Sequence, residues 1–329
     1  MINTPILLIT FNRPDHTRKV LESIVSAEPQ DLYVFQDGAR EGNQNDIEKG
    51  NLVRQTIVEL TKNTPIRVHT FYSDKNLGCG PGPMTGITWF FNQEERGIVM
   101  EDDCLPHPDF FEYCQELLER YQSNPQVLFI NATLYNDKWK CSASYDFSHY
   151  MVTGAWAGWK RTWEGFDLDL TSVNALKLRK HILNLTHNRG EANWWYAIVK
   201  EIQQDKSKKS YWDFQMQIHL FRNNALTIHP QRNLISNIGF DGEGTHTLDN
   251  NNNRGGKPVF PIMPLTHPSS IAVDVKRDAL CWAKGQSQSW AKDLLTLLYN
   301  HLLWSSGPGH YILMKYKQIR GKNINTKKV

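Results

Sequence analysis

The sequence predicts an α/β fold with a mostly parallel sheet that is flanked by helices on both faces. Up to residue 131, short apolar runs of strand character alternate with segments whose apolar residues recur at helical spacing. This alternation calls for crossover connections, which join parallel strands. Polar residues also gather directly after the apolar runs, where open parallel sheets bind their ligands. Both observations favour the same fold class.

The expected elements follow in order along the chain. Strands are expected at residues 5–10, 31–36, 66–72, 98–100 and 127–131, and helices at residues 15–26, 45–60, 83–92 and 109–121. In the second helix we expect Leu52, Ile57 and Leu60 to face the core. Later segments are less regular: a tryptophan-dense stretch at 155–163, and helices at 192–203 and 211–221. Ser210 is the expected N-cap of the last of these helices.

We expect one large domain at residues 1–260, with halves at 1–131 and 132–260, followed by a helical C-terminal extension at 261–329. A Gly/Asn-rich loop at 239–256 is long enough to be a functional lid or a disordered segment. The extension contains an apolar helix from Asp293 and then a basic tail. We interpret this end first as a core-packed helix with a frayed terminus, and alternatively as a peripheral contact with an anionic membrane surface.

Composition excludes several classes of function. The net charge of +3 is too small to indicate a nucleic-acid partner. The five cysteines are odd in number and contain no CxxC pair, so neither a disulfide framework nor a zinc site is expected, and a reducing compartment fits best. The sequence shows no signal peptide and no apolar stretch of membrane-spanning length, which favours a cytoplasmic protein. Neither GxGxxG after the first strand nor a P-loop motif is present.

Three consecutive carboxylates, Glu101, Asp102 and Asp103, follow the apolar run at 98–100. Such a cluster could ligate a divalent cation, hold a general base, or cap a helix. A cation is favoured because it offsets the mutual repulsion of the acids, whereas Asp109 already stands at the start of the next helix. If the strand alternation continues, Glu101 and Asp103 point to one side and Asp102 to the other. One or two of the acids would then bind the ion directly.

The predicted ion also indicates a class of substrate. Mg²⁺ or Mn²⁺ held by one or two carboxylates commonly meets phosphate oxygens. A site of this kind at the carboxyl ends of parallel strands, in a chain without a P-loop, points to nucleotide-sugar chemistry.

Six motifs in order then show a resemblance to a known family. They are PILLITFNRP from residue 5, VFQDG from 34, IVMEDDCLPHPDFFEYCQELL from 98, NATLYND from 131, YWDFQM from 211 and GFDGEGTH from 239. Together they resemble the metal-dependent GT-A fold glycosyltransferases, in particular the N-acetylglucosaminyltransferase I family. The likeness extends from residue 5 to about residue 246, roughly three quarters of the chain. The Gly/Pro-rich turn at 76–83 departs from that family, which has a histidine and basic residues there.

The resemblance implies an inverting transfer of a sugar from a nucleotide-diphosphate donor, UDP-GlcNAc or a similar UDP-sugar. It implies Asp213 as the catalytic base and Asp103 as the ligand of Mn²⁺ or Mg²⁺. The residues that it implies for donor binding are Arg13, Asp37, Glu101, Asp102 and Thr245. Residues 1–131 would be the nucleotide-sugar-binding half, 132–260 the acceptor-binding half, and 239–256 the mobile loop.

The family and the expected location together suggest a bacterial enzyme of surface polysaccharide or lipopolysaccharide synthesis, acting on a glycan or lipid-linked glycan. Two alternatives remain. A sugar nucleotidyltransferase would be expected to carry a Gly-rich loop with a lysine after the first strand, and TFNRPD lacks one. A catalytically silent sugar-binding protein would retain the pocket without turnover. Trp156, Trp159, Trp194, Trp195 and Trp212 could stack on sugars, but core packing is favoured for most of them.

Overall fold

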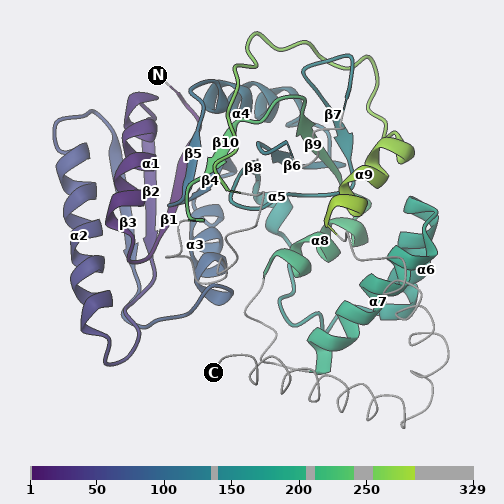
Figure 1. Cartoon of the computed structure of the whole chain (residues 1–329), viewed down its shortest axis with the longest axis horizontal. Helices are drawn as coiled ribbons and strands as arrows, with labels where there is room; N and C mark the ends of the chain where they lie inside the picture. Colours follow the sequence, from purple (N-terminus) through teal and green to yellow (C-terminus); the bar gives the residue numbers. More distant parts are fainter. Residues whose placement is uncertain (1, 135–139, 205–211, 241–254, 286–329) are drawn as a thin grey trace, which may run out of the picture.

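The structure, a computed structural model, describes residues 2–134, 140–204, 212–240 and 255–285 and confirms the predicted α/β class (Figure 1). Its strands are β1 Ile6–Thr10, β2 Asp31–Gln36, β3 Arg67–Tyr72, β4 Arg96–Glu101, β5 Cys104–Pro106, β6 Val127–Asn131, β7 Tyr145–Ser148, β8 Ala155–Trp159, β9 Leu226–Pro230 and β10 Ile235–Asn237. Its helices are α1 Pro14–Ser26, α2 Gln44–Thr61, α3 Pro81–Phe91, α4 Asp109–Arg120, α5 Lys160–Trp163, α6 Ala175–Thr186, α7 Arg189–Gln204, α8 Asp213–Arg222 and α9 Val275–Gly285.

Eight of these strands form one sheet in the order β3-β2-β1-β4-β8-β6-β9-β7. The first four are mutually parallel, and β8 runs antiparallel to both β4 and β6. Strands β6 and β9 are parallel to each other and therefore also to β4, whereas β7 is antiparallel to β9. The sheet is thus mostly parallel, and strands from both predicted halves of the large domain belong to it. A separate pair, β10 and β5, is antiparallel.

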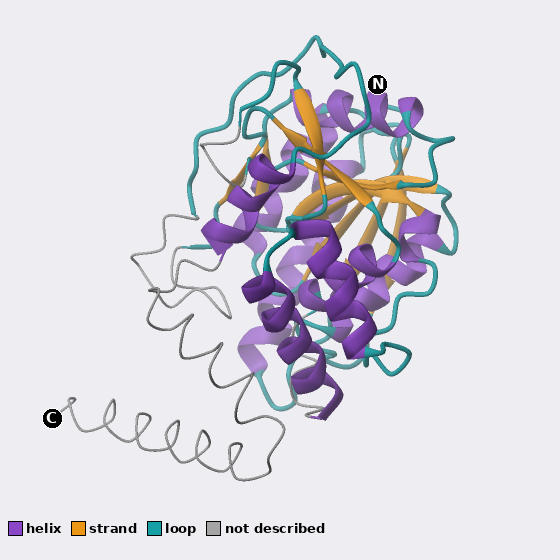
Figure 2. Cartoon of the chain, turned by 90° about the vertical axis from the view of Figure 1, so that its right-hand side faces the viewer, coloured by secondary structure: helices purple, strands orange, loops and turns teal. Residues whose placement is uncertain are grey.

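Alternation along β1 shows which helices cover each face of the sheet. Ile6 and Leu8 belong to a core cluster with buried side chains of α1, α2 and α4, while Leu7 and Ile9 belong to a second cluster with α3 and α8. Successive side chains of a strand point to opposite faces, so the two clusters lie on opposite sides of the sheet. Figure 2 shows helices on both sides.

The nine elements predicted up to residue 131 are all present, with small shifts at their ends. One predicted core position in α2 is wrong: Leu52 is 48% exposed, whereas Val53 and Ile57 are buried. These two residues are four apart on one helical face, and that face sets the contact with the sheet. The predicted N-cap Ser210 lies outside the described residues, and the residue at the N-cap of α8 is Trp212.

The second half of the chain adds a third core cluster beside the sheet. Helices α6 and α7 pack against each other, and α6 also contacts α8 and α9, at the right of Figure 1. The sequence pattern did not predict β5, β7, β8, β9, β10, α5, α6 or α9 as individual elements. The core interpretation of the tryptophans is confirmed for Trp156, Trp159, Trp195 and Trp212, which are at most 6% exposed.

The described part of the C-terminal extension is tied to the sheet domain. The Asp109 carboxylate accepts hydrogen bonds from the backbone N–H groups of Ile262 and Met263 at 2.8 and 2.9 Å. Arg277 in α9 forms an ion pair with Asp146 in β7. The helix predicted from Asp293 and the basic tail lie outside the described residues. Among the helices that are described, none is long and apolar enough to cross a membrane.

Candidate active site

The acidic triplet lies at the carboxyl edge of the parallel strands, as predicted. Glu101 is the last residue of β4, and Asp102 and Asp103 form the turn that leads into β5. Arg13 follows the neighbouring strand β1 and immediately precedes α1. Because β1 and β4 are paired and parallel, their ends bring Arg13 and the acids together.

Arg13 bridges two of the three acids. Its Nη1 donates to Asp103 Oδ2 at 3.0 Å, and its Nη2 donates to Asp102 Oδ1. The predicted alternation, with Asp102 pointing away from Asp103, is therefore wrong. The strand ends at Glu101, and the following turn directs both aspartates to one guanidinium.

The segment after β10 closes over this cluster. Asn237 Nδ2 donates to Asp103 Oδ1 at 3.3 Å, and the Ile238 N–H donates to the Asp103 carbonyl at 2.8 Å. A Cβ atom on Gly239 would lie 2.3 Å from Asp103 Oδ2 and 3.0 Å from Arg13 Nη1. A residue with a Cβ atom at this position would therefore force the Asp103 side chain to move. His16 of α1 holds the same segment through a 3.2 Å contact between its Nε2 and the Ile238 carbonyl oxygen.

The surroundings shift the pKa values of these groups. Burial raises the pKa of Glu101, and the neighbouring Asp103 and Asp213 add to this shift. Burial likewise raises the pKa of Asp102, although Arg13 opposes the change. Burial lowers the pKa of Arg13, but Asp102 and Asp103 outweigh that effect and the net shift is upward. Arg13 therefore stays charged and partly neutralises the acids.

Asp37, predicted to bind the nucleotide, directly follows β2 and holds a turn of the protein itself. Its Oδ1 accepts the N–H groups of Gly38 at 2.9 Å and Leu77 at 2.8 Å, and its Oδ2 accepts the Gly78 N–H at 2.9 Å and the Asn76 side chain at 3.1 Å. An ionised carboxylate has about four acceptor positions. All of them are used here, and the carboxylate fixes the loop that leads into α3. Direct contact of Asp37 with a nucleotide remains a prediction.

Asp213 is the first residue of α8, and its Oδ1 accepts the Phe214 N–H at 2.9 Å. The helix N-terminus favours the ionised form of an acid at this position. Asp213 lies within electrostatic reach of Glu101 and of Cys79, which lies just before α3. The structure thus brings the predicted base to the same edge of the sheet as the acidic triplet.

The two described ends of the segment 241–254 meet beside the acids. The Gly256 N–H donates to the Asn237 carbonyl at 2.9 Å, and Gly255 lies against the side chain of Phe240. Thr245 and most of the predicted lid lie outside the described residues, so their roles remain predictions.

The donor atoms fit a hard divalent cation held by a single carboxylate. Asp103 Oδ2 accepts one hydrogen bond from Arg13, and Oδ1 has two long contacts, from Asn237 at 3.3 Å and from the Cys104 thiol at 3.4 Å. Acceptor capacity therefore remains. Asp102 Oδ2 is buried and has no hydrogen-bond partner among the described residues. Those residues contain no group of three or more His, Cys, Asp or Glu side chains arranged for a metal, so phosphate oxygens and water would supply the other ligands.

Asn237, Gly239 and Cys104 complete the surroundings of Asp103, although no sequence pattern gave them individual roles. Their proximity depends on the antiparallel pairing of β10 with β5, in which Asn237 is opposite Cys104. The one available signal was position, because Gly239 is the first residue of the Gly/Asn-rich loop at 239–256 and Asn237 lies two residues before it.

Comparison with family models and with curated proteins finds no match. Among solved structures, the chain is similar to apo UDP-glucose pyrophosphorylase (10% identity, 72% of this chain and 93% of that chain, TM-score 0.38). A second similar structure is UDP-glucose pyrophosphorylase complexed with UDP-glucose (11% identity, 69% and 90%, TM-score 0.35). A third is 4-diphosphocytidyl-2C-methyl-D-erythritol synthase from Anaerococcus prevotii (9% identity, 49% and 75%, TM-score 0.31). At these identities and TM-scores, the similarities assign no activity to this chain.

Proposed function

We propose that the chain is a metal-dependent, inverting glycosyltransferase that moves a sugar from a nucleotide-diphosphate donor to a hydroxyl group of a glycan. The observation that carries this proposal is the convergence of separate chain segments at the carboxyl edge of the parallel strands. The turn after β4 contributes the acids, the β1–α1 connection contributes Arg13, and the start of α8 contributes Asp213. The six sequence motifs agree with this assignment.

Asp103 would hold Mn²⁺ or Mg²⁺, which would stabilise the charge that develops on the departing diphosphate. A cation at Asp103 would compete with Arg13 for one carboxylate. Arg13 would keep its contact with Asp102 and turn its remaining N–H groups toward a phosphate oxygen. Glu101 and Asp102 would contact the donor sugar and ribose.

Asp213 would accept the proton of the attacking hydroxyl group. The acceptor oxygen forms a bond to the anomeric carbon while the bond from that carbon to the diphosphate oxygen breaks, and the electron pair leaves with the diphosphate. A single displacement of this kind inverts the anomeric centre and needs only one base. The position of Asp213 at a helix N-terminus supports its ionised state before the reaction.

A sugar nucleotidyltransferase is the second candidate, because an acidic cation site would serve that reaction as well. The short connection between β1 and α1 favours the glycosyltransferase. It consists of Phe11, Asn12 and Arg13 and contains no glycine and no lysine.

The test combines the full chain, Mn²⁺ and a panel of UDP-, GDP- and dTDP-sugars. The proposal expects release of the nucleoside diphosphate, stimulated by glycan acceptors and lost in Asp103→Asn. Formation of a nucleoside triphosphate from nucleotide sugar and pyrophosphate would identify the nucleotidyltransferase instead. Donor binding without turnover under any condition would support a sugar-binding protein.

A further inference from the structure

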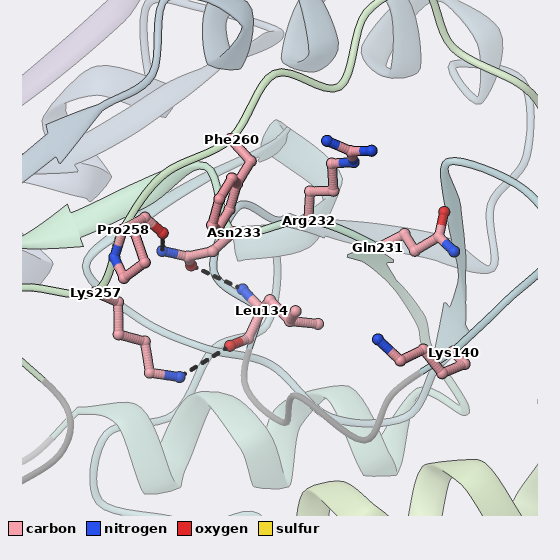
Figure 3. Close-up of a pocket in the computed structure, with 8 residues that line it drawn as sticks. All are labelled: Leu134, Lys140, Gln231, Arg232, Asn233, Lys257, Pro258 and Phe260. Atoms are coloured by element: carbon pink, nitrogen blue, oxygen red, sulfur yellow. Dashed lines mark hydrogen bonds between the residues drawn. The ribbon is translucent and has the colours of Figure 1, made fainter.

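A hollow lies at the carboxyl ends of β6 and β9, and none of the described residues that line it belongs to the acidic triplet (Figure 3). It has a volume of about 440 Å³. Gln231, Arg232 and Asn233 come directly after β9, and Leu134 follows β6 after two intervening residues. Because β6 and β9 are parallel neighbours, the segments that follow them meet at the same edge of the sheet.

The lining is cationic. Lys140, Arg232 and Lys257 contribute three positive side chains, and none of the described residues that line the hollow is acidic. In Figure 3 the ammonium groups of Lys140 and Lys257 lie on opposite sides of Leu134. Lys140 and Arg232 are exposed, and neither side chain has a hydrogen-bond or ion-pair partner among the described residues. Their charges therefore remain available to an anion.

A buried side chain with several hydrogen bonds, Asn233, forms the floor of the hollow. Asn233 is 5% exposed, and its side chain joins three segments. Its Oδ1 accepts the Leu134 N–H at 3.1 Å, and its Nδ2 donates to the carbonyl groups of Ile235 at 2.7 Å and Pro258 at 3.1 Å. Lys257 Nζ donates to the Leu134 carbonyl at 3.3 Å, which fixes a second wall. The shape of the hollow therefore exists before a ligand arrives.

Phe260 gives the hollow an aromatic side as well. Its N–H donates to the Asn233 carbonyl at 2.9 Å, so the backbone is anchored to the floor, yet the residue is 45% exposed. An accessible ring beside carboxamide and cationic groups is a combination that suits a saccharide, because the ring covers the apolar C–H face and the polar groups reach the oxygens.

The hollow is linked to the acidic site by one peptide bond and two hydrogen bonds. Lys257 follows Gly256, whose N–H donates to the Asn237 carbonyl, and the Asn237 side chain donates to Asp103. One end of this connection is rich in carboxylates and the other in cations. A negative group on a substrate would be held at the cationic end.

We propose that the hollow, called the cationic pocket from here on, binds a phosphate or carboxylate group on the saccharide that accepts the transferred sugar. Its role as an acceptor site rests on the proposed function, whereas anion binding by the pocket does not. The acceptor class is therefore an anionic glycan, either a sugar phosphate or a uronic-type acid, and not a neutral one.

Isothermal titration of the full chain with glucose 6-phosphate, glucuronate and glucose tests the pocket. The two anionic sugars are the probes, glucose is the neutral reference, and the two arms separate phosphate from carboxylate recognition. The variant is Lys140→Gln with Arg232→Gln, and the control is Lys62→Gln with Lys180→Gln, which removes the same charge from exposed positions elsewhere. We expect at least one anionic sugar to bind more tightly than glucose and to bind roughly tenfold more weakly to the pocket variant, with the control unchanged.

Three outcomes would overturn the proposal. The first is equal binding of glucose and both anionic sugars, and the second is binding of none of them. The third is an equal effect of the pocket and control variants, which would mean that only overall charge matters. A separate titration with UDP and Mn²⁺ reports on the donor site. If the wild-type chain bound an anionic sugar but not UDP with Mn²⁺, the proposed function would be refuted but not the pocket. If it bound UDP with Mn²⁺ but no anionic sugar, the pocket alone would be refuted.

If transfer is detected, the pocket variant should raise the acceptor KM with little change in kcat. Lys140 and Arg232 would contribute uniform binding, because they would contact a group of the acceptor that does not react. An unchanged KM for an anionic acceptor would contradict the assignment.

Discussion

Replacing Gly239 with alanine should push the Asp103 carboxylate away from its present position. The new Cβ atom would lie 2.3 Å from Asp103 Oδ2 and 3.0 Å from Arg13 Nη1. The backbone cannot easily retreat, because the Ile238 N–H is bonded to the Asp103 carbonyl and the Gly239 N–H to Asn237 Oδ1 at 2.9 Å. The side chain of Asp103 must therefore rotate.

The size of the effect follows from the overlap. Ordinary contact between these atoms requires a shift of about 1 Å, and overpacking of this kind costs roughly 1–3 kcal/mol of folding free energy. A displacement of about 1 Å in a substrate-positioning group can lower the rate on the order of a hundredfold. We therefore expect a modest loss of stability together with a large loss of metal-dependent nucleotide binding and transfer.

Urea unfolding measures the first effect, and titration of UDP in the presence of Mn²⁺ measures the second. Gly50→Ala in α2 is the matched control, since its nearest neighbour to a new Cβ would be Gln36 Nε2 at an ordinary 3.5 Å. The control should retain UDP binding and be neutral or slightly more stable. If Gly239→Ala bound UDP and Mn²⁺ as tightly as the wild type, the assigned position of Asp103 in the donor site would be wrong.

Three further predictions concern the core, a buried acid and the base. Trp156→Ala should lower the free energy of unfolding by about 3–5 kcal/mol in urea, because the ring stacks on Phe129 with centroids 4.5 Å apart and is 1% exposed; a loss under about 1 kcal/mol would contradict this packing. Burial raises the pKa of Glu191 from 4.5 to about 7, so the folded state holds a proton that the unfolded state has lost, and stability should fall as the pH rises from 4.5 to 7. Glu191→Gln removes the contribution of Glu191 to this dependence and should be more stable than the wild type at pH 8 by up to about 3 kcal/mol, while equal stability-pH curves would refute the assignment. Asp213→Asn should retain UDP and Mn²⁺ binding and lose transfer by at least about a hundredfold, and equal loss of both would contradict its role as the base.

The strand and helix pattern up to residue 131 could be predicted because each element has its own apolar periodicity. The site edge could be predicted as well, since Arg13, Asp37 and Glu101 all occur where a strand ends. The directions in which the side chains of Asp102 and Asp103 point could not be predicted. Alternation applies only while the strand continues, and the chain turns after Glu101, so that Asp102 and Asp103 share Arg13.

Other features depend on contacts between distant segments. Leu52 and Val53 are both apolar, and only the packing of α2 on the sheet decides that Val53 is buried. The cationic pocket likewise combines Lys140, Arg232 and Lys257, which are far apart in sequence. They meet through the pairing of β9 with β7 and with β6, and through the hydrogen bond from Asn233 to the Pro258 carbonyl. Neither the sequence spacing nor the charge pattern of the separate segments predicts that these three basic side chains lie close together.

The most direct test of the proposed donor site is a thermal-shift titration of the full chain with UDP, GDP and dTDP, each with and without Mn²⁺, in the wild type and in Asp103→Asn. A ligand that binds only the folded state raises its stability in proportion to the logarithm of concentration over Kd. We expect one nucleotide to stabilise the wild type only when Mn²⁺ is present and to have no effect on the Asp103→Asn variant. Stabilisation without Mn²⁺, or stabilisation that survives in the variant, would contradict a nucleotide diphosphate bound through a cation on Asp103.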